Sequence, residues 1–199
     1  LVSALPHADA AVEPDGPQRG KLWRRWRRKV YVAQTPSNGL GVFARRALSA
    51  GETVLVFSGQ RLRRGELSSH DAYAHSLQIG HDLYLGPSGG EDDYVNHACQ
   101  PNTALRGRRS LVALRPIAAG EEVTVDYASM TDEPGWRMAC FCGSAACRGV
   151  VRSYWETPET VRFQPHFRTW VAHDRVARGP RAAHPSGRAA DRGWTRVRP

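Results

Sequence analysis

The cysteines of this 199-residue chain form a single pattern, and they are the residues whose type and spacing most clearly specify chemistry. Cys140, Cys142 and Cys147 follow one another as C-x-C-x4-C, and Cys99 lies well upstream. Thiolate sulfur is a soft ligand, and four thiolates around one ion make the closed tetrahedral site of structural zinc. In a reducing compartment, cysteines arranged in this way indicate metal binding before disulfides. The sequence therefore predicts that these side chains bind one Zn²⁺ and tie two distant segments together.

Two polar segments would meet at such a metal. The segment 96–102 reads Asn-His-Ala-Cys-Gln-Pro-Asn, and the segment 120–127 reads Gly-Glu-Glu-Val-Thr-Val-Asp-Tyr. Asn96 carries both hydrogen-bond donors and acceptors, and His97 offers a flat ring with two nitrogens. Taken alone, this pair is also compatible with an ordinary turn, and Tyr127 with an aromatic residue at a strand edge.

A glycine motif, Gly39-Leu40-Gly41, lies nearer the N-terminus and continues with Val42 and Phe43. Glycine permits positive φ angles and a close approach of the backbone to a ligand, which suits a loop that presents its amides to a charged group. A glycine pair of this kind is weak evidence by itself, because many turns between strands have the same composition.

The elements that must position these residues are short strands. From residue 30 onward, runs of β-branched and aromatic residues are broken by Gly, Pro and Asn, which is typical of a mostly β fold. We expect strands at Val30–Ala33, Gly41–Ala44, Thr53–Phe57, Ser76–Ile79, Asp82–Leu85, Thr103–Arg106, Ser110–Ala113 and Glu122–Asp126. Helices are expected only at Gly65–Tyr73 and Thr157–Ala172.

Along the chain, the glycine motif comes first, followed by the Asn-His segment 96–102, the tyrosine segment 120–127 and the C-x-C-x4-C cysteines. These four motifs in this order resemble the SET-domain protein-lysine N-methyltransferases that carry a post-SET zinc module. The resemblance covers about residues 30–151. It implies a SET-domain fold of small curved sheets, in which the Asn-His segment and the tyrosine segment form a knot-like crossing, an exception to the rule that chains do not thread. It also implies a C-terminal zinc-bound post-SET flap.

The resemblance implies S-adenosyl-L-methionine as cofactor and methyl transfer to the ε-amine of lysine in a protein substrate. It implies cofactor binding by Gly39, Leu40, Gly41, Asn96, His97, Tyr127 and Phe141, and it makes Tyr127 the catalytic tyrosine. In the family, Asn96 and His97 would bind largely through main-chain contacts to adenine and through the Asn side chain. Phe141 would pack on adenine, with a place in the core as the alternative. The competing function is a catalytically inactive SET-like module, stabilised by zinc, whose basic tails attract nucleic acid.

Three positions depart from the family pattern. Phe57 stands where a tyrosine often contacts the substrate amine, which removes one hydrogen bond worth about 0.5–1.5 kcal/mol. Val125 lies two residues before Tyr127, where an aromatic side chain often limits how many methyl groups fit. We therefore predict a product that is not restricted to monomethyllysine. Ala98 replaces the usual serine, and the insert Arg61–His75 is a candidate for substrate specificity.

The charge distribution supports a division of the chain into four parts. Residues 1–29 carry a net charge of +4, residues 30–150 a net charge of −1 and residues 151–199 a net charge of +6. We expect a disordered, basic N-terminal arm at 1–29, a SET domain at 30–130, a post-SET module at 131–151 and a basic, largely disordered tail at 152–199. Basic tails attract phosphate without sequence specificity.

No run of about 18 apolar residues occurs, and the first residues lack the pattern of a secretory signal. The sequence predicts a soluble, intracellular protein in the cytoplasm, without a transmembrane segment.

Overall fold

The computed structural model describes residues 28–36, 39–67, 75–162 and 164–167. Most of the predicted N-terminal arm and the tail from residue 168 onward lie outside the described residues. Within the described part the chain forms twelve strands of two to five residues and a few single-turn helices, so the prediction of a mostly β fold is confirmed. None of the helices within this part has the length and apolar character that crossing a bilayer requires.

The first sheet is the hairpin of β1 (Val30–Gln34) and β2 (Leu40–Ala44), which pair antiparallel. Its turn is closed by the amide of Thr35, which donates to the carbonyl of Gly39 over 2.6 Å. Gly39 has a φ of 73°, a left-handed conformation that favours glycine. The glycine motif therefore lies at the start of β2.

The other strands form four small sheets. Three-stranded sheets are built by β3 (Thr53–Val56), β9 (Ser110–Ala113) and β8 (Thr103–Arg106), and by β4 (Arg61–Arg63), β6 (Leu83–Leu85) and β5 (Leu77–Gly80). Two-stranded sheets are built by β11 (Arg137–Ala139) with β12 (Val150–Arg152), and by β7 (Asn96–His97) with β10 (Thr124–Val125). The β7–β10 pair is parallel, with Asn96 opposite Thr124 and His97 opposite Val125. The two segments expected to cross therefore lie side by side.

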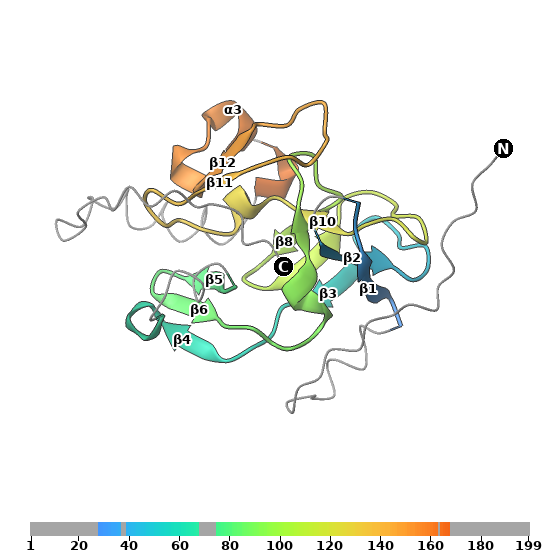
Figure 1. Ribbon diagram of the computed structural model, residues 1–199, viewed down its shortest axis with the longest axis horizontal. Helices are drawn as coiled ribbons and strands as arrows, with labels where there is room; N and C mark the ends of the chain where they lie inside the picture. The colour runs from blue at the N-terminus through green and yellow to red at the C-terminus, as the bar shows by residue number, and fades with distance from the viewer. Residues whose placement is uncertain (1–27, 37–38, 68–74, 163, 168–199) are drawn as a thin grey trace.

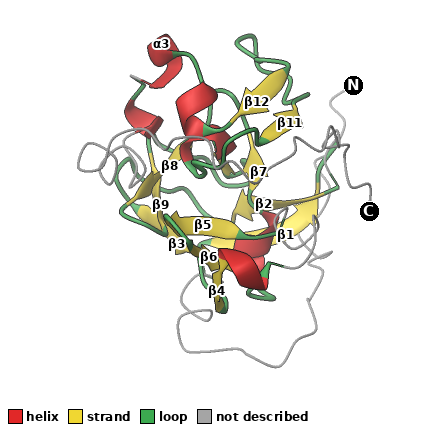
Figure 2. Cartoon of the chain, turned by 90° about the vertical axis from the view of Figure 1, so that its left-hand side faces the viewer, coloured by secondary structure: helices red, strands yellow, loops and turns green. Residues whose placement is uncertain are grey.

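Two apolar clusters occupy the inside of the molecule. The larger joins β1, β2, β3, β8, β9 and β10, and the smaller gathers β12 and the C-terminal turns around the cysteines. Tyr127 packs against both clusters. In Figures 1 and 2 the β11–β12 hairpin and α3 lie at one end of the molecule and β4 lies at the other. Tyr127 therefore lies where the two apolar clusters meet.

The strands at Thr103–Arg106 and Ser110–Ala113 are confirmed to the residue, and the others differ by one to three residues at their ends. The expected strand Glu122–Asp126 is shorter, because Glu122 makes only an isolated bridge to Phe43 and Asp126 caps the next turn. Four strands were missed: β4, β7, β11 and β12 have two or three residues each, too few to show a period of two.

The helix predictions are tested only in part. The described residues of Gly65–Tyr73 contain the end of the 3-10 turn η1 (Arg64–Glu66), and residues 68–74 lie outside the described part. A short helix was expected within Thr157–Ala172, and the described residues of that range form the single turn α3 (Glu159–Arg162) and then η5 (Pro165–Phe167). Pro165 has no amide hydrogen to continue α3. The remaining 3-10 turns are η2 (Glu91–Tyr94), η3 (Tyr127–Ser129) and η4 (Tyr154–Glu156).

Residues 152–167, assigned from the sequence to the tail, contribute to the folded part instead. Phe167 is fully buried, and Tyr154 is nearly so. These side chains join Cys99 and Cys140 in the smaller cluster. The sequence did not reveal this because the apolar residues here have no regular period.

Glu121 provides a test of how the tyrosine segment is held. Its carboxylate accepts hydrogen bonds from Arg115, from the amide of Ala118 and from Asn102, whose own oxygen accepts the amide of Thr124 in β10. Burial alone would raise the pKa of Glu121, but the hydrogen bonds from Arg115, Asn102 and Ala118 lower it to about 2. A carboxyl with a lowered pKa stabilises the folded state above its ordinary pKa, and this stability is lost as the pH falls toward the folded value.

We therefore expect Glu121→Gln to lower the free energy of unfolding at pH 7 and to have a shrinking effect from pH 4.5 down to about 2. Because Glu121 is partly exposed, the difference at pH 7 should be about 1 kcal/mol or less. Denaturant unfolding of both proteins across this range measures the difference. A difference in unfolding free energy that stays constant with pH would contradict a lowered pKa of Glu121 in the folded protein.

Candidate functional site

The four cysteines predicted to bind zinc lie together. Their Sγ atoms are all within 4.8 Å of one another, and each cysteine is free of a disulfide. The Sγ of Cys140 is 3.7 Å from that of Cys99 and 3.8 Å from that of Cys147. A tetrahedral zinc ion with Zn–S bonds of about 2.3 Å places its sulfurs about 3.8 Å apart. The donor set and its spacing therefore fit Zn²⁺.

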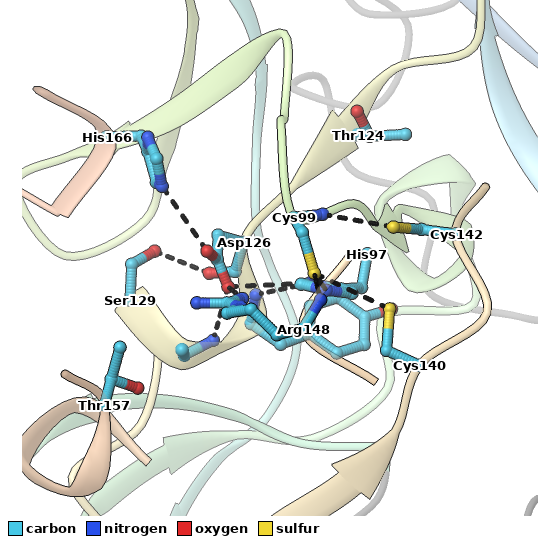
Figure 3. A network of polar contacts seen from close by, with 12 residues as sticks. His97, Cys99, Thr124, Asp126, Ser129, Cys140, Cys142, Arg148, Thr157 and His166 are labelled. Carbon is cyan, nitrogen blue, oxygen red and sulfur yellow. Dashed lines mark hydrogen bonds and ion pairs between the residues drawn. The ribbon is translucent and has the colours of Figure 1, made fainter. Parts of the chain in front are cut away.

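Backbone amides surround the same sulfurs. The amide of Cys99 donates to the Sγ of Cys142 over 3.5 Å, and the amide of Arg148 donates to the Sγ of Cys99 over 3.4 Å (Figure 3). The loop between β11 and β12 is closed by the amide of Cys140, which donates to the carbonyl of Gly149. Such N–H groups stabilise thiolates and orient metal ligands. The cysteine cluster thus has the surroundings of a thiolate metal site.

Tyr127 is held by the segment that leads to Cys99. Its amide donates to Nδ1 of His97 over 3.1 Å, and its hydroxyl donates to the carbonyl of Val95 over 2.7 Å. The rings of His97 and Tyr127 are tilted, with centroids 5.4 Å apart. Burial, with the Glu122 carboxylate nearby, raises the pKa of Tyr127 well above its ordinary value, so that the hydroxyl keeps its proton. Burial also lowers the pKa of His97 to about 4.

The glycine motif and Asn96 also come together. The side-chain amide of Asn96 donates to the carbonyl of Leu40 over 3.0 Å and to Oε1 of Glu122 over 2.8 Å. A Cβ on Gly41 would lie 2.6 Å from that same Glu122 oxygen and 2.8 Å from the Asn96 nitrogen. The start of β2 can therefore approach β7 only because residue 41 is glycine.

The remaining predicted residues lie as follows. Phe141 is 68% exposed beside the cysteines, so it is not part of the core. Phe57 and Val125 are both buried in the larger cluster, against which Tyr127 packs. Ala98 contributes its amide, which donates to the carbonyl of Val125, so a serine hydroxyl is not needed for this contact.

Sequence reasoning missed the buried carboxylate of Asp126. Its Oδ1 accepts from Arg148 over 2.6 Å and from the amide of Ala128 over 3.0 Å. Nε2 of His166 lies 3.4 Å from Oδ2, and Nδ1 of His97 lies 3.6 Å from Oδ1. Figure 3 shows the side chains of Arg148 and His166 directed at this carboxylate. Burial would raise the pKa of Asp126, but His166, His97 and Arg148 together hold it below its ordinary value.

This network joins three parts of the chain: the residue before Tyr127, the residue after Cys147, and η5. Two of its members could have been found from the sequence, because Asp126 directly precedes Tyr127 and Arg148 directly follows Cys147. The partner from η5 could not have been found, because nothing in the sequence pairs residue 166 with residue 126.

Comparisons with known proteins point in one direction. A family model described as "SET domain" matches residues 39–128. The chain is 27% identical over 161 residues to Histone-lysine N-methyltransferase trr of Drosophila melanogaster, a match that covers 73% of this chain and 7% of that protein. It is 29% identical over 135 residues to human Histone-lysine N-methyltransferase 2B, covering 60% of this chain and 5% of that protein. The chain therefore spans only a small part of these relatives.

A solved structure supports the fold. The methyltransferase domain of human Histone-lysine N-methyltransferase SETMAR aligns with a TM-score of 0.50 and 19% identity, covering 61% of this chain and 57% of that one. The matched family region contains the glycine motif, the Asn-His pair, Cys99 and Tyr127.

Proposed function

Residues 39–128 of the chain form a SET domain, and we propose from this that the protein transfers a methyl group from S-adenosyl-L-methionine to the ε-amine of a lysine in a protein substrate. The observation that carries the proposal is the meeting of the glycine motif, Asn96 and Tyr127 across β2, β7 and β10. Three motifs distant in sequence converge there, next to a cysteine cluster that fits zinc.

The cofactor would be held by the glycine motif, by Asn96 and His97, and by Phe141. Gly39 and Gly41 allow the backbone at the start of β2 to approach a ligand closely. The exposed ring of Phe141 offers an apolar face for adenine. When bound, S-adenosyl-L-methionine supplies an electrophilic methyl group on a sulfonium. The reaction needs no oxyanion hole, because the new N–C bond forms as the C–S bond breaks and the positive charge passes from the sulfonium sulfur to the lysine nitrogen.

The protein's own contribution would be alignment. The neutral lysine amine must point at the methyl group, and orientation of this kind accounts for about 7–11 kcal/mol of a barrier. The hydroxyl of Tyr127 keeps its proton and already donates to the Val95 carbonyl, which leaves its oxygen able to accept from the amine. Phe57 and Val125 line the cluster behind the tyrosine and have no hydroxyl of their own.

Zinc would serve structure rather than chemistry. Cys99, Cys140, Cys142 and Cys147 would hold the ion and so attach the β11–β12 module to the end of β7. Structural zinc contributes about 10–16 kcal/mol of apparent binding free energy in small peptides. A module of single turns and two short strands depends on such a contribution.

The protein substrate is proposed from the relatives, which are named as histone-lysine methyltransferases. The insert Arg61–His75 stays the candidate for substrate specificity; its described part comprises β4, η1, Leu67 and His75. The basic tails proposed to attract nucleic acid lie mostly outside the described residues, and that contact stays a prediction.

The second candidate is an inactive SET-like module. Titration calorimetry with S-adenosyl-L-methionine and the zinc-loaded chain separates the two in part, since the enzyme must bind the cofactor. Binding followed by methylation of a lysine substrate supports the enzyme. Absence of binding contradicts it, and binding without turnover of any protein substrate favours the module.

We expect Gly41→Ala to weaken binding of S-adenosyl-L-methionine by about tenfold or more, since 1.4 kcal/mol of lost contact is a factor of ten. The added methyl group would meet side-chain atoms of Glu122, Thr35 and Asn96 rather than backbone. Because these side chains must shift, the melting temperature should fall modestly, while cofactor affinity falls about tenfold or more. Calorimetry and a melting curve on the same preparation measure both.

The matched control is Gly65→Ala, because a Cβ there meets nothing within 4 Å and the residue has no positive φ. Gly65→Ala should leave the affinity for S-adenosyl-L-methionine and the melting temperature unchanged. If Gly41→Ala and Gly65→Ala bound S-adenosyl-L-methionine equally well, the proposal that the glycine motif contacts the cofactor would be contradicted.

A further inference from the structure

His97 lies between the cysteine cluster and Tyr127 and contacts both through its two ring nitrogens. Its Nε2 is 3.4 Å from the Sγ of Cys99, and its Nδ1 is 3.1 Å from the amide nitrogen of Tyr127. The side chain is 3% exposed, so water does not compete freely for either nitrogen. One buried ring therefore connects a zinc-ligand candidate with the catalytic-tyrosine candidate.

The contacts assign the tautomer of this ring. A backbone amide can only donate, so Nδ1 must present its lone pair to Tyr127, and the single proton of a neutral imidazole is then on Nε2. That proton points to the sulfur of Cys99. Oδ1 of Asp126 is 3.6 Å from Nδ1 but already accepts from Arg148 and Ala128. The backbone of Val125 also interacts with the ring.

Tyr127 is thus fixed at both ends by one short segment. Its amide is held by His97 and its hydroxyl by the carbonyl of Val95, two residues earlier. The segment ends at Cys99, so its position depends on whether that sulfur is fixed. A metal-bound thiolate is a fixed anionic acceptor, and hydrogen bonds to charged acceptors are stronger than those between neutral groups.

We propose that His97 is a positioning residue that couples the zinc site to Tyr127, its Nε2–H donating to the Cys99 thiolate and its Nδ1 accepting the Tyr127 amide. This goes beyond a main-chain contact of His97 with the cofactor, and its catalytic consequence rests on the proposed methyl transfer. The zinc-bound sulfur fixes the ring, and the ring fixes the tyrosine against which the lysine amine is aligned.

Two substitutions separate the two halves of this coupling. The Oδ1 of Asn takes the place of Nδ1, so His97→Asn keeps the acceptor for Tyr127 and loses the donor to Cys99. The Nε2 of Gln takes the place of the ring Nε2, so His97→Gln keeps the donor and loses the acceptor. The exposed His75, substituted in the same two ways, is the control for zinc affinity alone, because it belongs to the insert Arg61–His75 proposed for substrate specificity.

For His97→Asn we expect zinc affinity to fall about 10–100-fold, as for other groups that orient metal ligands. For His97→Gln we expect zinc affinity within about twofold of wild type and a kcat lowered about tenfold, with KM for S-adenosyl-L-methionine unchanged, since only an alignment step is disturbed. Competition with a chromogenic chelator measures the zinc affinity. The proposal would be overturned if both His97 variants had the zinc affinity of the His75 variants and the kcat of wild type. It would also be overturned if both His97 variants lost zinc affinity and kcat together.

A spectroscopic measurement keeps the test independent of activity. In the zinc-loaded full chain with ¹⁵N-labelled histidine, the long-range ¹H–¹⁵N spectrum should report the Nε2–H tautomer for His97. With ¹¹³Cd in place of zinc, the Nε2 proton should couple to the metal through the Cys99 sulfur. An Nδ1–H tautomer, or no coupling, overturns the proposal. If the chain transfers no methyl group but gives these spectra and the zinc effect of His97→Asn, the proposed function fails while the link to the metal stands.

Discussion

Replacing Tyr127 by Phe is expected to lower kcat for lysine methylation by about 10²-fold, the cost of misplacing a reacting group by about 1 Å. The partly buried hydroxyl keeps its proton and donates to the carbonyl of Val95, so its oxygen is available at one defined position. The phenyl ring still fills the contacts with both apolar clusters. Cofactor affinity should therefore stay within about threefold, since no packing is lost.

Tyr154→Phe is the matched control for this experiment. Tyr154 is a buried tyrosine of the smaller cluster, against which Tyr127 also packs, but it contacts neither the glycine motif nor β7 in any interaction the described residues show. Its variant should keep wild-type turnover. If the Tyr127→Phe protein were as active as the Tyr154→Phe protein, the hydroxyl of Tyr127 would have no role in the reaction. Residue 127 would then contribute only packing.

Removing zinc should abolish methylation and open the C-terminal module. The ion would connect Cys99 at the end of β7 to the β11–β12 hairpin, and its apparent contribution of about 10–16 kcal/mol equals or exceeds the whole stability of an ordinary domain. Cys140→Ala should yield chain without stoichiometric zinc, increased amide hydrogen exchange over residues 137–167, and no detectable turnover. Elemental analysis, hydrogen exchange and the methylation assay measure these three results.

Ala145→Ser is the control for a change in the same loop that removes no sulfur. Ala145 is exposed between Cys142 and Cys147. This variant should hold one zinc ion per chain and keep its activity. A Cys140→Ala protein that retains an ordered module and full turnover without metal would contradict the role given to the four thiolates.

The cysteine pattern predicted that the four sulfurs lie together, because ligand geometry is local and strict. Their spacing in the structure fits zinc. The meeting of the Asn-His pair with Tyr127 was also predicted, since a metal bound by Cys99 and the later cysteines would join their segments. Their roles toward a cofactor and a lysine stay predictions that the experiments above address.

What the sequence did not reveal depends on contacts between distant residues. Strands β7 and β10 have two residues each, and their parallel register is set by backbone contacts such as Ala98 to Val125. The carboxylate of Asp126 is stabilised by Arg148 and by His166, which arrive from two later segments. The short helix expected within Thr157–Ala172 is present as the single turn α3, and Pro165, which has no amide hydrogen, is a local reason that the sequence offered for its shortness.

The most direct test of the proposed function is transfer of an isotope-labelled methyl group. The zinc-loaded chain is incubated with labelled S-adenosyl-L-methionine and either core histones or a cell lysate, beside the Tyr127→Phe protein, and the products are hydrolysed and identified by mass spectrometry. We predict label in ε-N-methyllysine, in forms not restricted to one methyl group, and little or none with Tyr127→Phe. Cofactor binding without labelled lysine in any protein, or equal labelling by the variant, would contradict the account.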